Sequence, residues 1–252
     1  MSKLSKKLLF LILALVVIVS FAYFKNKSSN IVIWVWERSE NLYFMENENV
    51  SFSYLAGTIT KTDKGLIPHF RQQPLRIPDN SKTMAVVRIE HRIENKDLSD
   101  SDRKIITKFI IESCTQLEKN SSCQIDFDAT KSQLDFYKKL LIDVRHALPK
   151  KMKLSITSLL SWCTTKNAWF DNSPVDEVVP MFFRLGTDSN EYWSKIKNNK
   201  LELNPACKKS IGISTDENLP KKYLKNKTIY IFNNEYWSYE NWSKIKASIN
   251  EK

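Results

Sequence analysis

The sequence is poor in glycine, and it lacks the spacings of cysteine and histidine that bind metals. Only four of its 252 residues are glycine, so asparagine and lysine occupy the places where turns are expected. No CxxC or His-x-His pair occurs, and the three histidines are dispersed at His69, His91 and His146. We therefore expect no structural metal site and no cofactor.

A nucleic-acid-binding motif is also absent, although the net charge is +11. The basic residues are scattered rather than gathered in an arginine-rich stripe, so we expect no nucleic-acid partner. A basic surface that meets an anionic envelope polymer or a lipid headgroup fits the same charge equally well. The chain is long enough for one large domain or two small ones, and its order shows no boundary for a second domain.

The first segment bears on where the protein is located. Three lysines (Lys3, Lys6 and Lys7) precede an uncharged run from Leu8 to Phe24, which as a helix would span about 25 Å, at the short edge of what crosses a bilayer. Residues 20–22 resemble a small-x-small cleavage site, so residues 1–24 are either a signal anchor, which we favour, or a removed signal peptide. The basic flank then orients the chain so that a linker (25–30) and a single domain (31–252) are extracytoplasmic, either inner-membrane anchored or exported.

Four cysteines in an exported protein can form disulfides. Cys114 lies late in a predicted helix and Cys123 begins the next strand, at the same end of this unit, which favours a bridge between them. Cys163 follows the end of one predicted strand, whereas Cys207 precedes the start of another. Because those positions fall at opposite ends of a parallel sheet, a Cys163–Cys207 bridge is the less expected pairing.

Alternating apolar residues and β-branched content predict eight strands, with helices after most of them. The strands are expected at 31–36, 50–59, 83–90, 123–128, 154–159, 175–185, 210–214 and 227–232, and the helices at 99–118, 131–148, 191–197 and 238–250, with a further helical turn after the capping-box spacing of 214–217. This order predicts an α/β fold, a (β/α)8 TIM-type barrel preceded by an N-terminal hydrophobic helix. Its first third is expected to be irregular, because residues 61–82 have the character of a long proline-containing loop.

The strand at 123–128 carries polar residues along one face, which is unusual for a parallel sheet covered on both sides. Gln124, Asp126 and Asp128 share this face, and parity places Arg88 and Glu90 on the inward face of the neighbouring strand. If the barrel forms, these side chains converge at its C-terminal mouth, where such folds keep their chemistry. The alternative is that Arg88 pairs with Asp126 only to satisfy a buried charge.

Carboxyl groups gathered at a barrel mouth suit glycoside hydrolysis, which commonly needs one protonated acid and one ionised nucleophile or base. Repulsion between neighbouring carboxylates raises the pKa of one and so divides these roles. Asp128, nearest the strand end, is the first candidate for acid/base catalysis, and Asp126 would orient it or stabilise positive charge. Glu90 and Glu37 are the candidates for a second catalytic carboxylate.

Four segments together resemble the bacterial family known as domain of unknown function 3142. They are Ile31–Arg38, Gln124–Asp128, Leu154–Trp162 and Asp176–Arg184, and the resemblance extends over most of residues 31–235. It implies a glycoside-hydrolase-like barrel but no particular reaction. The chitinase-type signature Asp-x-Asp-x-Glu is not met, because Thr130 stands where the acid glutamate would be, so chitinase chemistry by that route is not supported.

Tryptophans at or after predicted strand ends suggest a carbohydrate ligand, since flat rings stack on sugar faces. Core packing is the alternative for each of them, and especially for Trp34. The expected substrate-binding residues are Trp36, Glu37, Arg88, Trp162 and Arg184. The sequence thus predicts an extracytoplasmic glycoside-hydrolase-like protein acting on an envelope or extracellular glycan, or else a non-catalytic glycan-binding or envelope assembly barrel.

Overall fold

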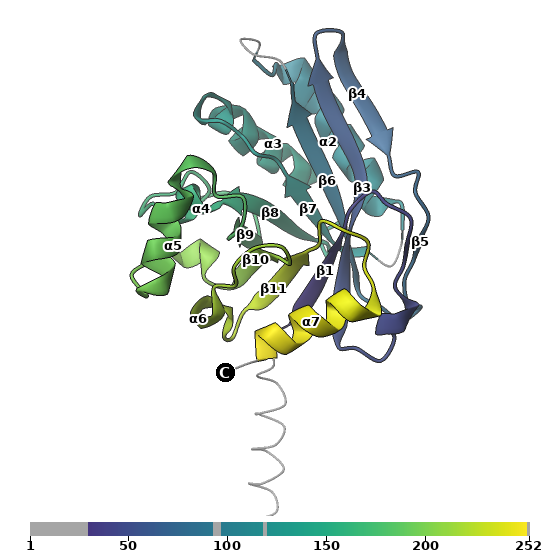
Figure 1. Ribbon diagram of the computed structural model, residues 1–252. Helices are drawn as coiled ribbons and strands as arrows, with labels where there is room; N and C mark the ends of the chain where they lie inside the picture. Colours follow the sequence, from purple (N-terminus) through teal and green to yellow (C-terminus); the bar gives the residue numbers. More distant parts are fainter. Residues whose placement is uncertain (1–29, 93–96, 118–119, 251–252) are drawn as a thin grey trace, which may run out of the picture.

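The computed structural model describes residues 30–92, 97–117 and 120–250, and its centre is a closed barrel of eight parallel strands (Figure 1). Around the barrel the order is β1-β3-β6-β7-β8-β9-β10-β11, and β1 pairs with both β3 and β11 to close it. The strands are β1 (Ile31–Val35), β3 (Val50–Thr62), β6 (Thr83–His91), β7 (Asn120–Asp126), β8 (Lys153–Leu159), β9 (Glu177–Met181), β10 (Ser210–Ser214) and β11 (Thr228–Phe232). The predicted TIM-type barrel and its eight strands are confirmed.

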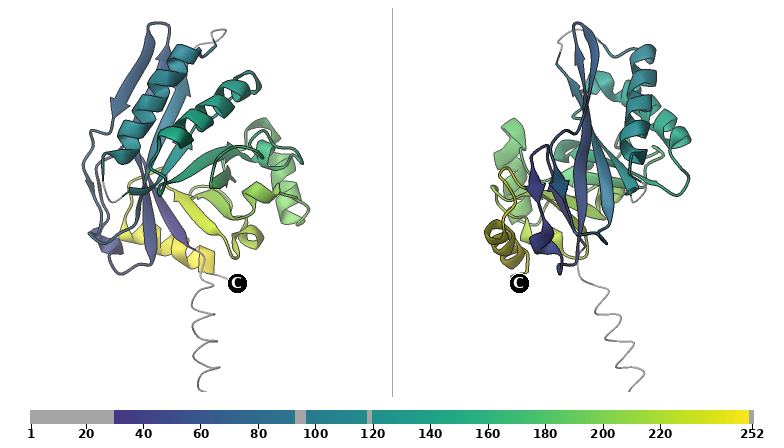
Figure 2. Two further views of the ribbon diagram at one scale, coloured as in Figure 1. Left: turned by 180° about the vertical axis from the view of Figure 1, so that it is seen from behind. Right: turned by 90° about the vertical axis from the view of Figure 1, so that its right-hand side faces the viewer.

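Helices follow each barrel strand from β6 onward and cover the outside of the barrel (Figure 2). They are α2 (Asp100–Thr115), α3 (Leu134–Ala147), α4 (Leu160–Cys163), α5 (Ser189–Lys197), α6 (Lys221–Leu224) and α7 (Tyr239–Asn250). Helix α2 is capped by Ser99, whose side chain accepts from the Asp102 N–H while the Asp102 carboxylate accepts from the Ser99 N–H. This reciprocal capping box satisfies two N–H groups at the helix start and fixes where α2 begins.

The first third of the barrel lacks helices between its strands. β1 and β3 are joined by β2 (Glu40–Asn41) and a 3-10 turn (Tyr43–Met45), and β3 and β6 by β4 (Gly65–Phe70) and β5 (Leu75–Arg76). The expected irregularity is confirmed, but the expectation of a structureless loop at 61–82 was wrong. β4 pairs antiparallel with the end of β3, and Pro68 is tolerated there because β4 is an edge strand.

The inside of the barrel is filled by a small core of its own, separate from the larger core between strands and helices. It includes Val32, Trp34, Leu55, Val86, Val179 and Tyr230. The Trp34 indole N–H donates to Gln124 (2.8 Å), and the Gln124 amide donates to Ser155 (3.0 Å). Gln124 is therefore a buried residue satisfied within the barrel interior, which explains one of the three polar residues on its strand face.

Both cysteine pairs form disulfides. Cys114 and Cys123 are bridged with their Cα atoms 5.4 Å apart, as predicted. Cys163 and Cys207 are also bridged, at 5.8 Å, so their placement at opposite ends of the sheet was wrong. The chain between α5 and β10 returns over the outside of the barrel, where a 3-10 turn (Pro205–Cys207) contacts β9 and the Asn204 N–H donates to the Cys163 carbonyl (2.7 Å). Strand ends alone do not determine where such a connection runs.

Two further expectations concern helices. No helix begins at the predicted 214–217 capping box; instead Glu217 accepts from the Arg184 N–H (2.8 Å), and α6 starts only at Lys221. The predicted hydrophobic helix within 1–24 lies outside the described residues. Within the ranges that are described, none of the helices is long and apolar enough to cross a membrane.

Candidate functional site

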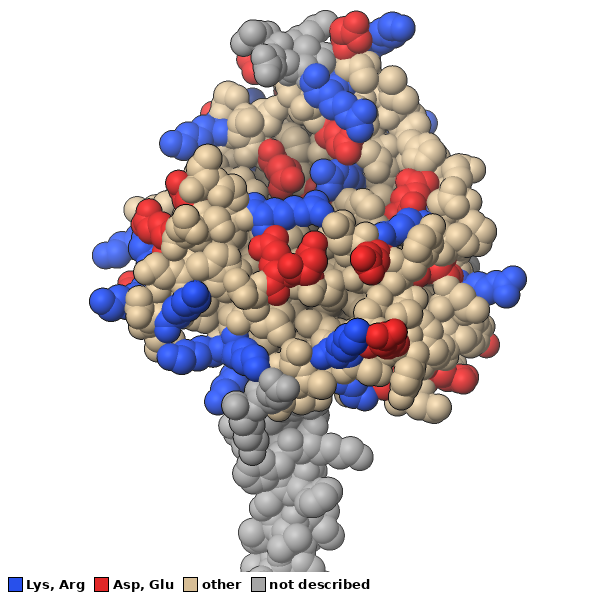
Figure 3. All heavy atoms as spheres, in the orientation of Figure 1, with Lys and Arg blue, Asp and Glu red and all other residues tan. Residues whose placement is uncertain are grey.

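A cleft of about 600 Å³ opens at the carboxyl ends of the barrel strands. Carboxylates and guanidinium groups line it together with aromatic rings, and Figure 3 shows acidic and basic side chains close together in a hollow of the molecular surface. Its charged lining consists of Glu37, Arg38, Arg88, Glu90, Asp126, Asp128 and Arg184. The structure thus brings all but one of the predicted site residues to one cleft, the exception being Trp162.

Asp126, the last residue of β7, is buried, and each of its two carboxylate oxygens accepts a hydrogen bond. One carboxylate oxygen accepts from the Thr157 hydroxyl at 2.7 Å, and the other accepts from Arg88 at 3.2 Å. Its side chain is 9 % exposed, so these two donors replace the water that a carboxylate would otherwise bind. Asp126 therefore has a fixed position at the floor of the cleft.

Arg88, on β6, lies at the centre of the charged lining. Besides Asp126 it contacts Glu90 (3.2 Å), and its guanidinium lies 5.4 Å from the centre of the Trp36 ring. Glu90 in turn accepts from Arg92 (2.5 Å) and from the Thr60 hydroxyl (3.3 Å). With three donors on its two oxygens, Glu90 is placed to hold Arg88 in position.

Asp128 differs from these carboxylates, because no other side chain or backbone group in the described parts of the chain donates a hydrogen bond to it. It lies two residues beyond the end of β7 and opens into the cleft. The surrounding protein removes enough water to raise the pKa of its carboxyl to about 6, and the charge of Asp126 adds to this, while Arg88 and Arg184 oppose it. A carboxyl of this kind is protonated in mildly acidic solution and ionises above about pH 6.

The far side of the cleft carries Glu37, which follows β1, three strands around the barrel from β7. It accepts from the backbone N–H of Gln72 (3.1 Å) and lies 2.8 Å from Nε2 of His69, which belongs to the edge strand β4. Arg184 adopts a left-handed backbone conformation (φ 51°), and its side chain contacts Asn234 (3.3 Å). Both residues are thus tied to connecting segments rather than to the barrel wall.

The aromatic residues divide between the cleft and the core. Trp36 lines the cleft, half-buried, with its ring edge-on to Phe232 at 5.8 Å. Trp162 does not reach the cleft, since it lies in α4 and packs partly buried against the outer core. Trp34 is buried inside the barrel, and the Trp237 indole donates to the Trp34 carbonyl (3.2 Å), so these two are packing residues.

Several cleft residues were not anticipated from the sequence, notably Arg38, Phe183 and Asn234. Arg38 donates to the backbone carbonyls of Asn233 and Asn234, which follow β11, and so ties together the two segments where the barrel closes. Arg38, Phe183 and Asn234 each lie shortly after the end of a strand, and this position was the signal available in the sequence. The pairing of β1 with β11, which closes the barrel, brings Arg38 close to Asn233 and Asn234.

These features define the chain as a (β/α)8-type barrel with a carboxylate-lined cleft at its carboxyl-end mouth. Residues 79–179 match the model of the family described as domain of unknown function DUF3142, and this stretch contains Asp126 and Asp128. The resemblance drawn from the sequence is thus confirmed over that part of residues 31–235. No curated protein matches the chain.

Among solved structures, the chain is similar to the spore cortex-lytic enzyme SleL of Bacillus cereus. The two share 16 % sequence identity with a TM-score of 0.42, over 74 % of this chain and 50 % of that one. The chain therefore spans about half the length of that structure.

Proposed function

We propose that this protein is an extracytoplasmic glycoside-hydrolase-like barrel that acts on an envelope or extracellular glycan, with Asp128 as its acid/base group. The observation that carries the proposal is the contrast between two neighbours. Asp126 is held by Thr157 and Arg88, whereas Asp128 opens into the cleft with its pKa raised to about 6. A carboxyl with a pKa near 6 is protonated in mildly acidic solution, where it can donate its proton to the oxygen of a leaving sugar.

The other cleft residues then take supporting roles. The fixed carboxylate of Asp126 stabilises the positive charge that develops on the sugar ring, and its negative charge helps keep Asp128 protonated. Trp36 offers a ring face for stacking, and the Arg184 guanidinium binds sugar hydroxyls at the rim. Glu37, across the cleft, is the second carboxylate in this scheme, and Glu90 positions Arg88.

One observation favours a second candidate function, that of a non-catalytic glycan-binding or envelope assembly barrel. Apart from Asp128, every carboxylate that lines the cleft already accepts a hydrogen bond or ion pair from the protein: Glu37, Glu90 and Asp126. A catalytic base or nucleophile works best when its oxygens are free to meet water or the sugar. Under this alternative the cleft binds a glycan without turnover.

The proposed location rests on the two disulfides and on the hydrophobic run of the sequence. Disulfides persist in oxidising compartments outside the cytoplasm. An anchor formed by Leu8–Phe24 would hold the barrel at the outer surface of the inner membrane, within reach of envelope glycans.

The test compares the wild type with Asp128→Asn on a panel of envelope glycans. The asparagine keeps the size of the side chain but loses its proton, so turnover should fall by about 10²–10⁴-fold while glycan affinity changes little. In the wild type, turnover should also fall above about pH 6, as the acid loses its proton. Asp97→Asn, at an exposed carboxylate outside the cleft, is the matched control and should leave turnover unchanged. Turnover retained by folded Asp128→Asn would refute the catalytic role, and a wild type that binds glycans without turnover would favour the binding barrel.

A further inference from the structure

Tyr236 is an exposed aromatic residue beside the carboxylate cleft, and the proposed chemistry does not use it. It lies in the segment that follows β11 and is 62 % exposed. The guanidinium of Arg38, which lines the cleft, lies over the Tyr236 ring at 5.7 Å from the ring centre. Because the guanidinium covers one face of the ring, the exposed area leaves the other face open to a ligand.

The backbone that carries Tyr236 is held by side chains on both sides. The Tyr236 carbonyl accepts from the side-chain amides of Asn233 (3.2 Å) and Asn241 (2.7 Å). The next residue, Trp237, is buried, and its N–H donates to the Glu40 carboxylate (3.2 Å). These contacts fix the place where the ring emerges, so a ligand that stacks on it has little backbone freedom to restrict.

The rim of the cleft is continuous between the Tyr236 ring and Asp128. Asn234 lies two residues before Tyr236, is exposed and lines the cleft. Its side chain accepts from Arg184 (3.3 Å), which lines the same cleft as Asp128. The ring is therefore joined to the candidate acid through cleft residues and does not stand alone on the surface.

A second ring with the same arrangement lies inside the cleft. Trp36 directly follows β1, is half-buried and lines the cleft. The Arg88 guanidinium lies 5.4 Å from the centre of its ring, as that of Arg38 does at Tyr236. The cleft thus has one stacking surface within it and another at its rim, and flat rings of this kind bind the faces of sugars.

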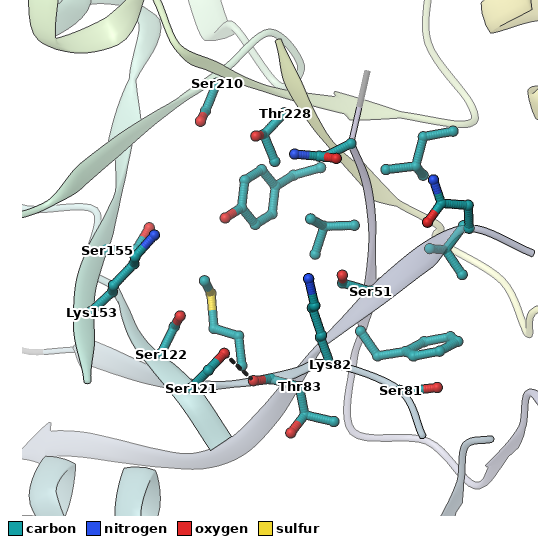
Figure 4. Close-up of a pocket in the computed structure, with 18 of the residues that line it drawn as sticks. Ser51, Ser81, Lys82, Thr83, Ser121, Ser122, Lys153, Ser155, Ser210 and Thr228 are labelled. Atoms are coloured by element: carbon teal, nitrogen blue, oxygen red, sulfur yellow. Dashed lines mark hydrogen bonds between the residues drawn. The ribbon is translucent and has the colours of Figure 1, made fainter. Parts of the chain in front are cut away.

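Among the residues that the structure describes, the opposite end of the barrel has no comparable lining. An opening of about 870 Å³ lies at the amino ends of the strands, and Figure 4 shows Lys82 and Lys153 there among serines and threonines. The aromatic residues of this lining, Phe52 and Tyr230, are both buried. A sugar chain that stacks on exposed rings is therefore directed to the carboxyl-end mouth.

We propose that Tyr236 forms an outer sugar-binding subsite, so that the ligand of this barrel is an extended chain of several sugars and not a single terminal sugar. The subsite rests on the proposed function, since it assumes that the cleft holds a glycan, and it adds the length of the substrate. Sugars beside Trp36 and Asp128 fill the cleft. The chain then continues past Asn234 to the Tyr236 ring, which contributes to binding and takes no part in bond cleavage.

The test compares the binding of short and long chains by a form of the protein that does not cleave them. Every variant is made in the full-length chain carrying Asp128→Asn, in neutral detergent micelles. The probes are β-linked oligosaccharides of N-acetylglucosamine and of glucose, each as a disaccharide and a hexasaccharide, and calorimetric titration gives their dissociation constants. Tyr236→Ala removes the ring and Tyr236→Phe keeps it. The matched control is Tyr43→Ala, at an exposed tyrosine whose hydroxyl donates to Asp79 on the lining of the amino-end opening.

The expected result is a tighter binding of one hexasaccharide than of its disaccharide, and a rise of about tenfold in the hexasaccharide dissociation constant for Tyr236→Ala. The disaccharide constant should not change, because two sugars are held within the cleft. Tyr236→Phe and Tyr43→Ala should leave both constants unchanged. An unaltered hexasaccharide constant in Tyr236→Ala would overturn the subsite, as would an equal loss for both chain lengths. A loss in Tyr43→Ala alone would also overturn it, because the chain would then bind near the amino-end opening.

These outcomes separate the subsite from the proposed reaction. Hexasaccharide binding that does not depend on Tyr236 refutes the subsite and leaves the role of Asp128 to the turnover assay. Binding through Tyr236 without any hydrolysis by the chain with Asp128 intact refutes catalysis and supports the subsite. If neither hexasaccharide binds, the subsite is refuted for chains of this kind. Because Tyr236 is exposed, its replacement leaves no buried cavity, so equal melting temperatures should exclude misfolding as the cause.

Discussion

The pKa of Asp128 predicts that replacing this residue stabilises the protein at neutral pH. Its value of about 6 lies above the ordinary value of 3.8, so the folded protein holds this proton to higher pH than the unfolded chain does. The free energy of unfolding of the wild type therefore falls as pH rises from about 4 to about 6 and stays lower above that. The asparagine side chain in Asp128→Asn has no titratable proton, so the variant should escape this loss.

The size of the effect follows from the shift and from the exposure of the side chain. A shift from 3.8 to about 6 corresponds to an upper limit of about 3 kcal/mol. Because Asp128 is open to water in the cleft, we discount this to about 1 kcal/mol. For a chain of this size that amounts to a rise in melting temperature of about 2–4 °C.

The assay is thermal unfolding of the wild type and Asp128→Asn at pH 4 and pH 7.5. The variant should melt higher at pH 7.5 and at the same temperature near pH 4, where the wild-type carboxyl is protonated. Asp97→Asn, at an exposed carboxylate, should show no such difference. A variant that melts lower than the wild type at pH 7.5 would refute the reasoning, because it would mean that the charge of Asp128 stabilises the fold through Arg88 or Arg184.

Two further predictions concern the framework of the site. Arg88→Met leaves the buried carboxylate of Asp126 without its cation, so the free energy of unfolding should fall by about 1–3 kcal/mol at pH 7. Arg88→Lys should recover part of this loss. Equal stability of the wild type and both variants in urea unfolding would contradict the prediction. The Cys163–Cys207 bridge closes a longer loop than Cys114–Cys123, at separations of 44 and 9 residues. Replacing each pair by alanine should therefore cost about 4 and about 2.6 kcal/mol respectively, and the reverse order in the same assay would exclude the loop-length explanation.

Most of the barrel could be predicted from the sequence, because its strands are short runs with clear alternation or β-branched content. The strand at 210–214 was placed with its observed bounds, and β11 differs from its prediction by one residue. What could not be predicted was the path of segments outside the barrel. β4 is held by pairing with β3, and the turn before Cys207 by contact with β9, and both depend on partners distant in the sequence.

The site was predictable to the extent that strand parity determines which side chains point inward. Parity placed Arg88, Glu90 and Asp126 correctly in one cleft. It could not place Trp162, because α4 turns away directly after β8 and carries that ring to the outer core. Nor could it foresee His69 beside Glu37, since β4 was not predicted as a strand.

The polar face of β7 can now be explained residue by residue, and the explanation bears on function. Gln124 is used within the barrel interior by Trp34 and Ser155, and Asp126 by Thr157 and Arg88. Asp128 alone, beyond the strand end, has no hydrogen bond from the described residues. A buried polar group is retained when the fold satisfies it, whereas a partly desolvated carboxyl that accepts no hydrogen bond from the protein is less stable in its charged form, and here Arg88 and Arg184 offset only part of that cost. Stability therefore accounts for the first two residues and not for the third, and this is the physical reason to look for the chemistry of this barrel at Asp128.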